Sequence, residues 1–346
     1  MSNSSFFRRT NKVARPPLVD SPLLPETENR HSDRYKIIPA LAETDHLSLE
    51  WYPYIMRRST PQHRSPTLNT DEFGFRRCKY GDKLIGFEDI LTHAGPIGLL
   101  SGNSTAFGIG ASSDSYIIPS ILNGSDSNTV WYNLAHRASN LTQERINLDL
   151  YAPPNTQYVV LLSGANNLIL TLLDGNGDRF RPPFVGEQKF RTLNPSTNNP
   201  ALPFEERFKL MMEVMARDFM LLGQNAKSNG LRCLFILQPL AAWCSRTFCR
   251  EEVELIEIWD AHSSLLHSVH APESLNPWRE AFVSRIQILC QLNGVDFIDL
   301  NTCEKFLSGK WVFADRVHLA DEGNKIVAEI INNWARIVES DIKLNQ

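Results

Sequence analysis

A serine in the first third of the chain and an acid–histidine pair near its C-terminal end are the residues best suited to chemistry. Ser104 stands in the run Gly102-Asn103-Ser104-Thr105, just past an apolar stretch, and Asp315 precedes His318 by three residues. A serine hydroxyl becomes a good nucleophile when a neutral imidazole removes its proton. An acid that holds the imidazole in the productive tautomer completes a catalytic triad. We therefore predict that Ser104, His318 and Asp315 meet in the folded chain.

An asparagine further along is placed to stabilise the oxyanion that such a serine creates. Asn166 belongs to the run Gly164-Ala165-Asn166-Asn167, which follows another apolar segment. One amide donor aimed at an oxyanion contributes about 3 to 4 kcal/mol to transition-state stabilisation. Two structural alternatives stay open at this point. In the first, Asn166 has a purely structural role and hydrogen-bonds a loop backbone. In the second, Ser104 has a purely structural role as a helix cap.

Short apolar runs alternate with amphipathic stretches from about residue 93 onward, which indicates an α/β fold. The runs that read as buried parallel strands are Pro96–Leu100, Thr129–Leu134, Tyr158–Leu162, Leu231–Leu237 and Val295–Leu300. Helical spacing predicts helices over Phe204–Lys227 and from Asp321 to about Val338. Right-handed crossovers then give a doubly wound, five-stranded parallel sheet in three α/β/α layers, a flavodoxin-like arrangement. Ligands of such sheets bind at the carboxyl ends of the strands, where Ser104 and Asn166 fall.

The chain divides into three parts on composition. Residues 1–35 are rich in Pro, Ser, Asn and charge, and we expect a disordered tail. Residues 36–92 are aromatic and mixed, and we expect an N-terminal extension packed on the core. Residues 93–341 form the main domain. Within it, residues 238–277 are a Trp-bearing insertion that forms either a lid with an acyl pocket or a helical decoration of the sheet.

Composition and cysteine spacing exclude several function classes. The net charge of -4 gives no sign of a nucleic-acid partner, and no apolar run approaches the roughly 18 residues of a membrane span. The N-terminus lacks the apolar stretch of a secretory signal peptide, and the scattered cysteines suit a cytoplasmic protein. We predict neither a metal nor a cofactor. Spacing or residue type disfavours three metal sites: a zinc pair at Cys244 and Cys249, a histidine group at His262, His267 and His270, and a calcium loop over Asp174–Asp178.

Four blocks in chain order resemble the SGNH, or GDSL-like, hydrolase family. The blocks are Gly102-Asn103-Ser104, the stretch from Asn133 to Asn140, Gly164-Ala165-Asn166-Asn167, and Asp315-x-x-His318. The resemblance covers residues 93 to 340. An α/β-hydrolase would place its serine in Gly-x-Ser-x-Gly on a later strand, whereas here Ala106 takes the place of the second glycine.

The resemblance implies a role for each block. Ser104 would be the nucleophile, His318 the base and Asp315 its partner, while Ser104 N–H, Ala138 N–H and the Asn166 side chain would form the oxyanion hole. Asn103, Asn167 and Trp243 are candidates for contact with substrate. The implied reaction is hydrolysis of an O-acyl ester, with an acetyl ester of a carbohydrate preferred because the similar branch often serves surface polysaccharides. An acyltransferase with the same triad, or a non-catalytic binding module that retains the fold, are the alternatives. The sequence leaves the oligomeric state open.

Three residues depart from the family pattern. Ala138 stands in the place of a glycine, so its N–H remains a donor only if the backbone there does not demand a positive φ. Asn103 and Asn167 each replace an aspartate and remove its charge. None of the three substitutions removes a triad member.

Overall fold

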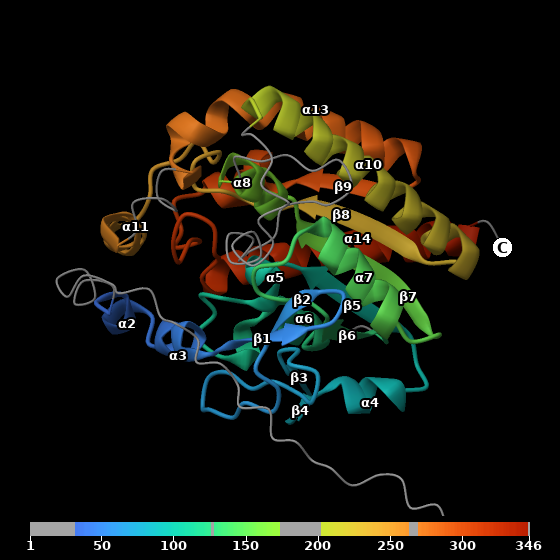
Figure 1. The fold of residues 1–346 in the computed structure, drawn as a ribbon. Helices are drawn as coiled ribbons and strands as arrows, with labels where there is room; N and C mark the ends of the chain where they lie inside the picture. The colour runs from blue at the N-terminus through green and yellow to red at the C-terminus, as the bar shows by residue number, and fades with distance from the viewer. Residues whose placement is uncertain (1–31, 126–127, 174–201, 263–268, 345–346) are drawn as a thin grey trace, which may run out of the picture.

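A five-stranded parallel sheet forms the centre of the molecule (Figure 1). The computed structural model describes residues 32–125, 128–173, 202–262 and 269–344. The strand order is β6-β5-β7-β8-β9. Their bounds are β5 (Ile97–Gly102), β6 (Val130–Asn133), β7 (Thr156–Ser163), β8 (Arg232–Leu237) and β9 (Asp296–Asp299). All five predicted strands are confirmed. β5, β6, β7 and β8 are buried along nearly their whole length, as expected of strands covered on both faces, whereas β9 is only half-buried.

Helices cover both faces of the sheet and complete the predicted three layers. One face packs against α7 (Leu141–Tyr151), α8 (Ala165–Leu173), α10 (Phe204–Asn229) and α13 (Pro272–Leu292). The other face packs against α5 (Ser104–Phe107), α6 (Ile118–Asn123) and α14 (Asp321–Leu344). The helix predicted from Phe204 ends as expected, where Gly230 adopts the left-handed conformation that closes many helices.

The N-terminal segment folds into two short helices, two antiparallel hairpins and a further helix against the main domain. Their bounds are α2 (Arg34–Ile37), α3 (Ala40–His46), β1 (Leu49–Tyr52), β2 (Met56–Ser59), β3 (Cys78–Tyr80), β4 (Lys83–Ile85) and α4 (Phe87–Leu91). Buried polar contacts attach this segment to the core. The Asp71 carboxylate accepts hydrogen bonds from the Phe87 amide and the Tyr132 hydroxyl, and Arg76 pairs with Asp114 at 2.8 Å.

Ordered structure begins inside the stretch expected to be a disordered tail. α2 starts at Arg34, whose side chain is only 1% exposed and pairs with Asp45 at 2.7 Å. Helical structure therefore begins just before the expected boundary at residue 35, because the buried Arg34 side chain has an acidic partner in α3. Residues 1–31 lie outside the described part of the chain, as does the loop Asp174–Asp178. The expected insertion at 238–277 contains α11 (Arg250–His262) and the first turns of α13.

Candidate active site

Three side chains form a continuous hydrogen-bonded line at the carboxyl ends of the strands. His318 Nε2 lies 2.8 Å from Ser104 Oγ, and His318 Nδ1 lies 2.6 Å from Asp315 Oδ2. A carboxylate only accepts hydrogen bonds, so Nδ1 carries the proton and donates it to Asp315. Nε2 is then left to accept from the serine hydroxyl. This is the geometry of a serine nucleophile with its base and orienting acid.

Ser104 is presented by a sharp turn between β5 and α5. Gly102 ends β5 with a φ of 149°, and a Cβ atom built there would lie 2.3 Å from the Leu162 carbonyl oxygen. Only glycine fits so close an approach. Asn103 then caps α5, because its side chain accepts a hydrogen bond from the Thr105 amide at 3.0 Å. The strand therefore turns directly into a helix whose first residue is the nucleophile.

A buried network joins the serine turn to the histidine loop. Asn103 donates to the Gln238 side chain, Gln238 donates to Thr105 Oγ1 at 3.2 Å, and Thr105 Oγ1 donates to the Val317 carbonyl at 2.9 Å. Asn103 is 0% exposed, so it acts as a structural link rather than a surface for substrate. Although Asn103 lacks the charge of an aspartate, its amide holds the turn through two hydrogen bonds.

The loop that carries Asp315 and His318 is held together by hydrogen bonds within the loop, and Asp315 is ionised. Asp315 Oδ1 accepts from the amides of Val317 and His318, each at 2.8 Å, and the Ala314 amide donates to the His318 carbonyl at 2.9 Å. Burial opposes ionisation of Asp315. It is outweighed by His318, the Val317 amide and the Arg34 guanidinium, which together hold the pKa of this carboxyl well below its usual range.

The three segments that are expected to supply oxyanion donors contact one another at the ends of β5, β6 and β7. The segment after β6 lies against the end of β5, because the His136 amide and the Ser139 hydroxyl both donate to the Gly102 carbonyl, at 3.0 and 3.1 Å. From the start of α8, Asn166 Nδ2 donates to the Ser139 carbonyl at 2.6 Å. An amide nitrogen has two protons, so this bond orients the second one. Within the described residues, no acceptor pairs with the backbone amide of Ser104 or Ala138.

Ala138 adopts the left-handed conformation that suits the family's glycine, with a φ of 63°. Ala138 therefore has the positive φ that the sequence-based expectation for its N–H donor required it to avoid. The N–H is retained, but the Cβ methyl is attached to a strained backbone. Left-handed backbone costs an L-residue roughly 1–2 kcal/mol, part of which glycine recovers. We expect Ala138→Gly to raise the free energy of unfolding by about 1 kcal/mol, measured by denaturant titration.

The matched control for this substitution is Ala135→Gly, three residues earlier in the same segment. Ala135 is fully buried and has no positive φ. The same change there should lower the free energy of unfolding by about 1 kcal/mol. A loss of stability at both positions would show that the backbone at Ala138 is not strained.

A buried glutamate contacts Ser139 in the segment that follows β6. Glu144 on α7 is 0% exposed, and its Oε1 is 3.3 Å from Ser139 Oγ. Burial raises the pKa of Glu144 from 4.5 to about 8, although the Ser163 and Ser139 hydroxyls oppose this and Asp218 adds to it. The folded protein therefore holds a proton here that the unfolded chain releases above its ordinary pKa. Stability is lost as pH rises between these two values.

We expect Glu144→Gln to remove this loss. The variant and the wild type should have similar unfolding free energies near pH 4.5. By pH 8 the variant should be more stable by about 4 kcal/mol, since the pKa is raised from 4.5 to about 8 and one pKa unit corresponds to about 1.4 kcal/mol. Denaturant titrations across this range measure the difference, with the exposed Glu280→Gln as the control. A difference that stays flat with pH would contradict the raised pKa.

Three of the polar or aromatic residues that the sequence singled out are buried in the core and do not face the Ser104–His318 pair. Trp243 is 1% exposed and packs near Phe282, which leaves it almost no surface for a substrate. Asn167 is 3% exposed and accepts a hydrogen bond from the Leu141 amide. His136 packs against Phe75 with 4.7 Å between ring centroids, and burial together with Arg58 lowers its pKa to about 3. His136 is therefore no rival to His318 as the base.

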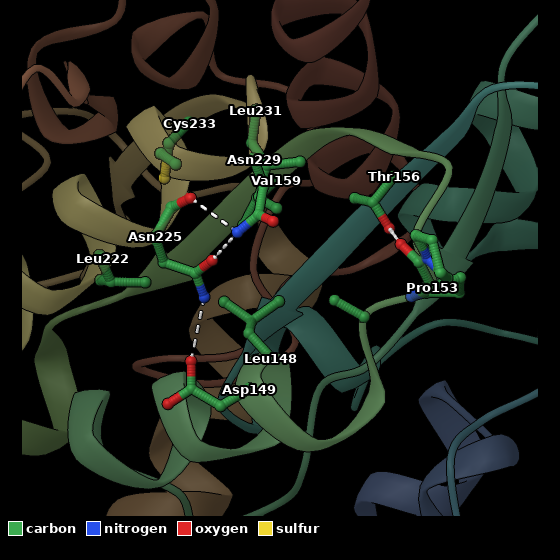
Figure 2. Close-up of a pocket in the computed structure, with 13 residues that line it drawn as sticks. Leu148, Asp149, Pro153, Thr156, Val159, Leu222, Asn225, Asn229, Leu231 and Cys233 are labelled. Carbon is green, nitrogen blue, oxygen red and sulfur yellow. Dashed lines mark hydrogen bonds between the residues drawn. The ribbon is translucent and has the colours of Figure 1, made fainter.

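A cavity of about 320 Å³ lies at the opposite end of the sheet (Figure 2). It opens between α7 and α10 at the amino ends of β7 and β8, where Leu148, Val159 and Leu222 line it beside the hydrogen-bonded pair Asp149 and Asn225. The triad follows the carboxyl ends of the strands. The cavity therefore shares no residue with the site formed by Ser104, His318 and Asp315.

Three residues near the triad lie outside the four blocks, and only Trp259 was a sequence candidate, as part of a lid or acyl pocket. Gln238 links the two loops, Trp259 on α11 meets the His318 ring edge-on with 6.5 Å between centroids, and Arg34 lies 4.0 Å from Asp315 Oδ2. Their positions depend on packing between distant elements, which no local pattern encodes.

The described residues hold no group of three or more His, Cys, Asp or Glu side chains arranged to bind a metal ion. His267, one of the three histidines weighed as ligands, lies outside them. No helix in the described part of the chain has the length and apolar character needed to cross a membrane. All six cysteines are free.

No family model matches this sequence, and no curated protein matches it either. Similar solved structures include an acetyl xylan esterase, with 13% identity, 70% of this chain and 99% of the other covered, and a TM-score of 0.38. An extracellular lipase from Streptomyces rimosus has 13% identity, 69% and 99% coverage, and a TM-score of 0.44. A GDSL-like lipase from Bacteroides thetaiotaomicron has 14% identity, 70% and 88% coverage, and a TM-score of 0.37. All three are remote from this chain, whose activity depends on its own side chains.

Proposed function

We propose that this chain is a serine ester hydrolase of the SGNH type, with Ser104, His318 and Asp315 as its triad. The single observation that carries the proposal is the unbroken line from Ser104 Oγ through the imidazole to the buried Asp315 carboxylate. Residues 214 positions apart meet in that line with both hydrogen bonds at good length. A serine that only capped a helix would need no such partner.

The reaction follows from the roles of the three side chains. His318 Nε2 takes the proton of Ser104 as Oγ forms a bond to the acyl carbonyl carbon, and the carbonyl oxygen becomes an oxyanion. The amides of Ser104 and Ala138 and the Asn166 side chain donate to it. As the intermediate collapses, the bond to the alkoxy oxygen breaks and His318 protonates the departing alcohol. A water, deprotonated by His318, then releases the carboxylic acid from Ser104.

For the substrate we favour a short O-acyl ester, with an acetyl group on a carbohydrate as the preferred class. A methyl group at Ala138, where the resembling family has a glycine, would leave less room for a long acyl chain. Turnover of p-nitrophenyl acetate, butyrate and octanoate compares acyl lengths directly, and acetylated sugars test the alcohol. We also infer a cytoplasmic location, since six free thiols fit a reducing compartment.

A fluorophosphonate probe tests the proposal most directly. It should label wild-type protein at one serine, identified as Ser104 by peptide mass spectrometry, and abolish turnover of p-nitrophenyl acetate in parallel. Ser112→Ala, which removes an exposed hydroxyl paired with Asp321, should label as wild type does. Labelling that survives Ser104→Ala, or no labelling of a folded wild-type protein, would rule the function out.

A further inference from the structure

An arginine from α2 lies against the carboxylate of the triad. Arg34 Nη2 donates to Asp45 Oδ2 at 2.7 Å, and Nη1 lies 4.0 Å from Asp315 Oδ2. The same oxygen of Asp315 accepts the hydrogen bond from His318. The Arg34 side chain is only 1% exposed. Because a guanidinium stays charged even when buried, it requires negative charge close by.

α11 holds this guanidinium from its other side. Arg34 Cζ is 5.1 Å from the centroid of the Trp259 ring, within the range of a cation–π contact. The same ring meets the His318 imidazole at an interplanar angle of 83°. α2 and α11 are far apart in the sequence but touch at this point, and Figure 1 shows them on one side of the molecule. Trp259 therefore packs against Arg34 and His318 at once.

The further charged or titratable side chains around this site include Asp260, Arg316, Tyr35 and Arg137. Asp260 pairs with Arg316 at 2.5 Å, beside the triad loop. The Tyr35 hydroxyl donates to Asp45 at 2.9 Å, and burial together with Asp45 raises the pKa of Tyr35 to about 12. Arg137 also acts electrostatically on Asp45, and its side chain donates to the Leu47 carbonyl at 2.6 Å. These groups are the same in every variant considered below.

We propose that Arg34 is a positioning residue for the reaction above, and that Asp45, Arg34 and Asp315 form an alternating row of charges that sets how readily His318 takes up a proton. The three charges sum to one negative charge, which one imidazolium neutralises. Without Arg34, two carboxylates would favour the imidazolium in the resting protein. Without the Asp45 charge, the imidazolium would be disfavoured. The inference rests on the proposed function, since a base must be neutral before it can act.

The two charges of the row should have opposite effects on the pH profile. We expect Arg34→Met to shift the acidic limb of the kcat/KM pH profile to higher pH by about one unit, and to lower activity at pH 6 by about tenfold. Asp45→Asn should move the same limb downward. The double variant should return close to the wild-type profile, because its charge sum is again one negative charge. Arg34→Lys should keep the limb near its wild-type position.

A matched control separates this role from simple loss of a buried ion pair. Arg145 Nε pairs with the buried Asp218 at 2.9 Å between α7 and α10, away from the triad. Arg145→Met should lower the unfolding temperature without moving the acidic limb. If Arg34→Met does the same and no more, Arg34 is only structural and the proposal is overturned.

A readout that needs no turnover decides the inference independently. The His318 imidazole can be titrated by NMR, with its signal assigned by its loss in His318→Gln. An upward shift of the midpoint in Arg34→Met with a downward shift in Asp45→Asn supports the charge row. Midpoints that stay fixed, or that move in the same direction, overturn it. A wild-type protein that neither turns over esters nor takes the fluorophosphonate would defeat the proposed function alone.

Discussion

Ser104→Ala should reduce kcat/KM for p-nitrophenyl acetate by about 10⁴-fold or more, since the members of a triad act as one unit. The only side-chain partner of Ser104 Oγ within the described structure is His318 Nε2, at 2.8 Å. Losing one partly buried hydrogen bond costs about 1 kcal/mol of stability. The variant should therefore be inactive yet unfold at nearly the wild-type temperature. Parallel kinetics and thermal unfolding measure the two effects.

The value of this experiment lies in the contrast between its two readouts. Equal rates for Ser104→Ala and wild type would show that another group attacks the ester. A large fall in unfolding temperature would show that the hydroxyl belongs to the fold. The control is Ser112→Ala, which should keep full activity although its hydroxyl also pairs with a residue near the C-terminal helix, Asp321.

Asp315→Asn should lower kcat/KM by about 10³- to 10⁴-fold, through the wrong imidazole tautomer. Oδ1 of Asp315 is held by two backbone amides, so an asparagine keeps its oxygen there and turns its NH2 toward His318 Nδ1. Nδ1 must then accept a hydrogen bond, and the proton moves to Nε2. An Nε2–H faces the serine as a donor and cannot remove its proton.

The matched control is Asp260→Asn, which changes a second carboxylate beside the same loop. Asp260 pairs with Arg316, next to Asp315, at 2.5 Å, but contacts neither ring nitrogen of His318. Its loss should change kcat/KM by less than tenfold, since partly exposed ion pairs contribute up to about 1 kcal/mol. If Asp315→Asn retains more than a tenth of the wild-type rate, Asp315 does not set the tautomer.

The strands and main helices of this fold could be predicted from the sequence because their signals are local. A continuous apolar run such as Val159–Leu162 is buried on both faces, and the glycine after α10 marks the end of that helix. Because Ser104 and Asn166 each follow a predicted strand, the sequence also indicated that they lie at the same end of the sheet. Their convergence follows from parallel topology, not from any contact visible in the sequence.

The residues around the triad were harder to foresee because their roles depend on long-range packing. Arg34 falls in a stretch whose composition indicates disorder, yet it is buried between Asp45, Asp315 and Trp259. Trp243 was a candidate for substrate contact in a lid or acyl pocket, yet it fills the core beside Phe282. An exposed tryptophan and a buried one look the same in a sequence.

The separation of the two catalytic loops has a consequence for biosynthesis. The ribosome makes Ser104 early, directly after β5, but His318 follows the edge strand β9 and lies only three residues before α14 begins. A nascent chain therefore carries the serine without its base until the segment after β9 has emerged. Recovery of esterase turnover during refolding should accordingly lag behind recovery of helical circular dichroism, and would report on the last stage of assembly.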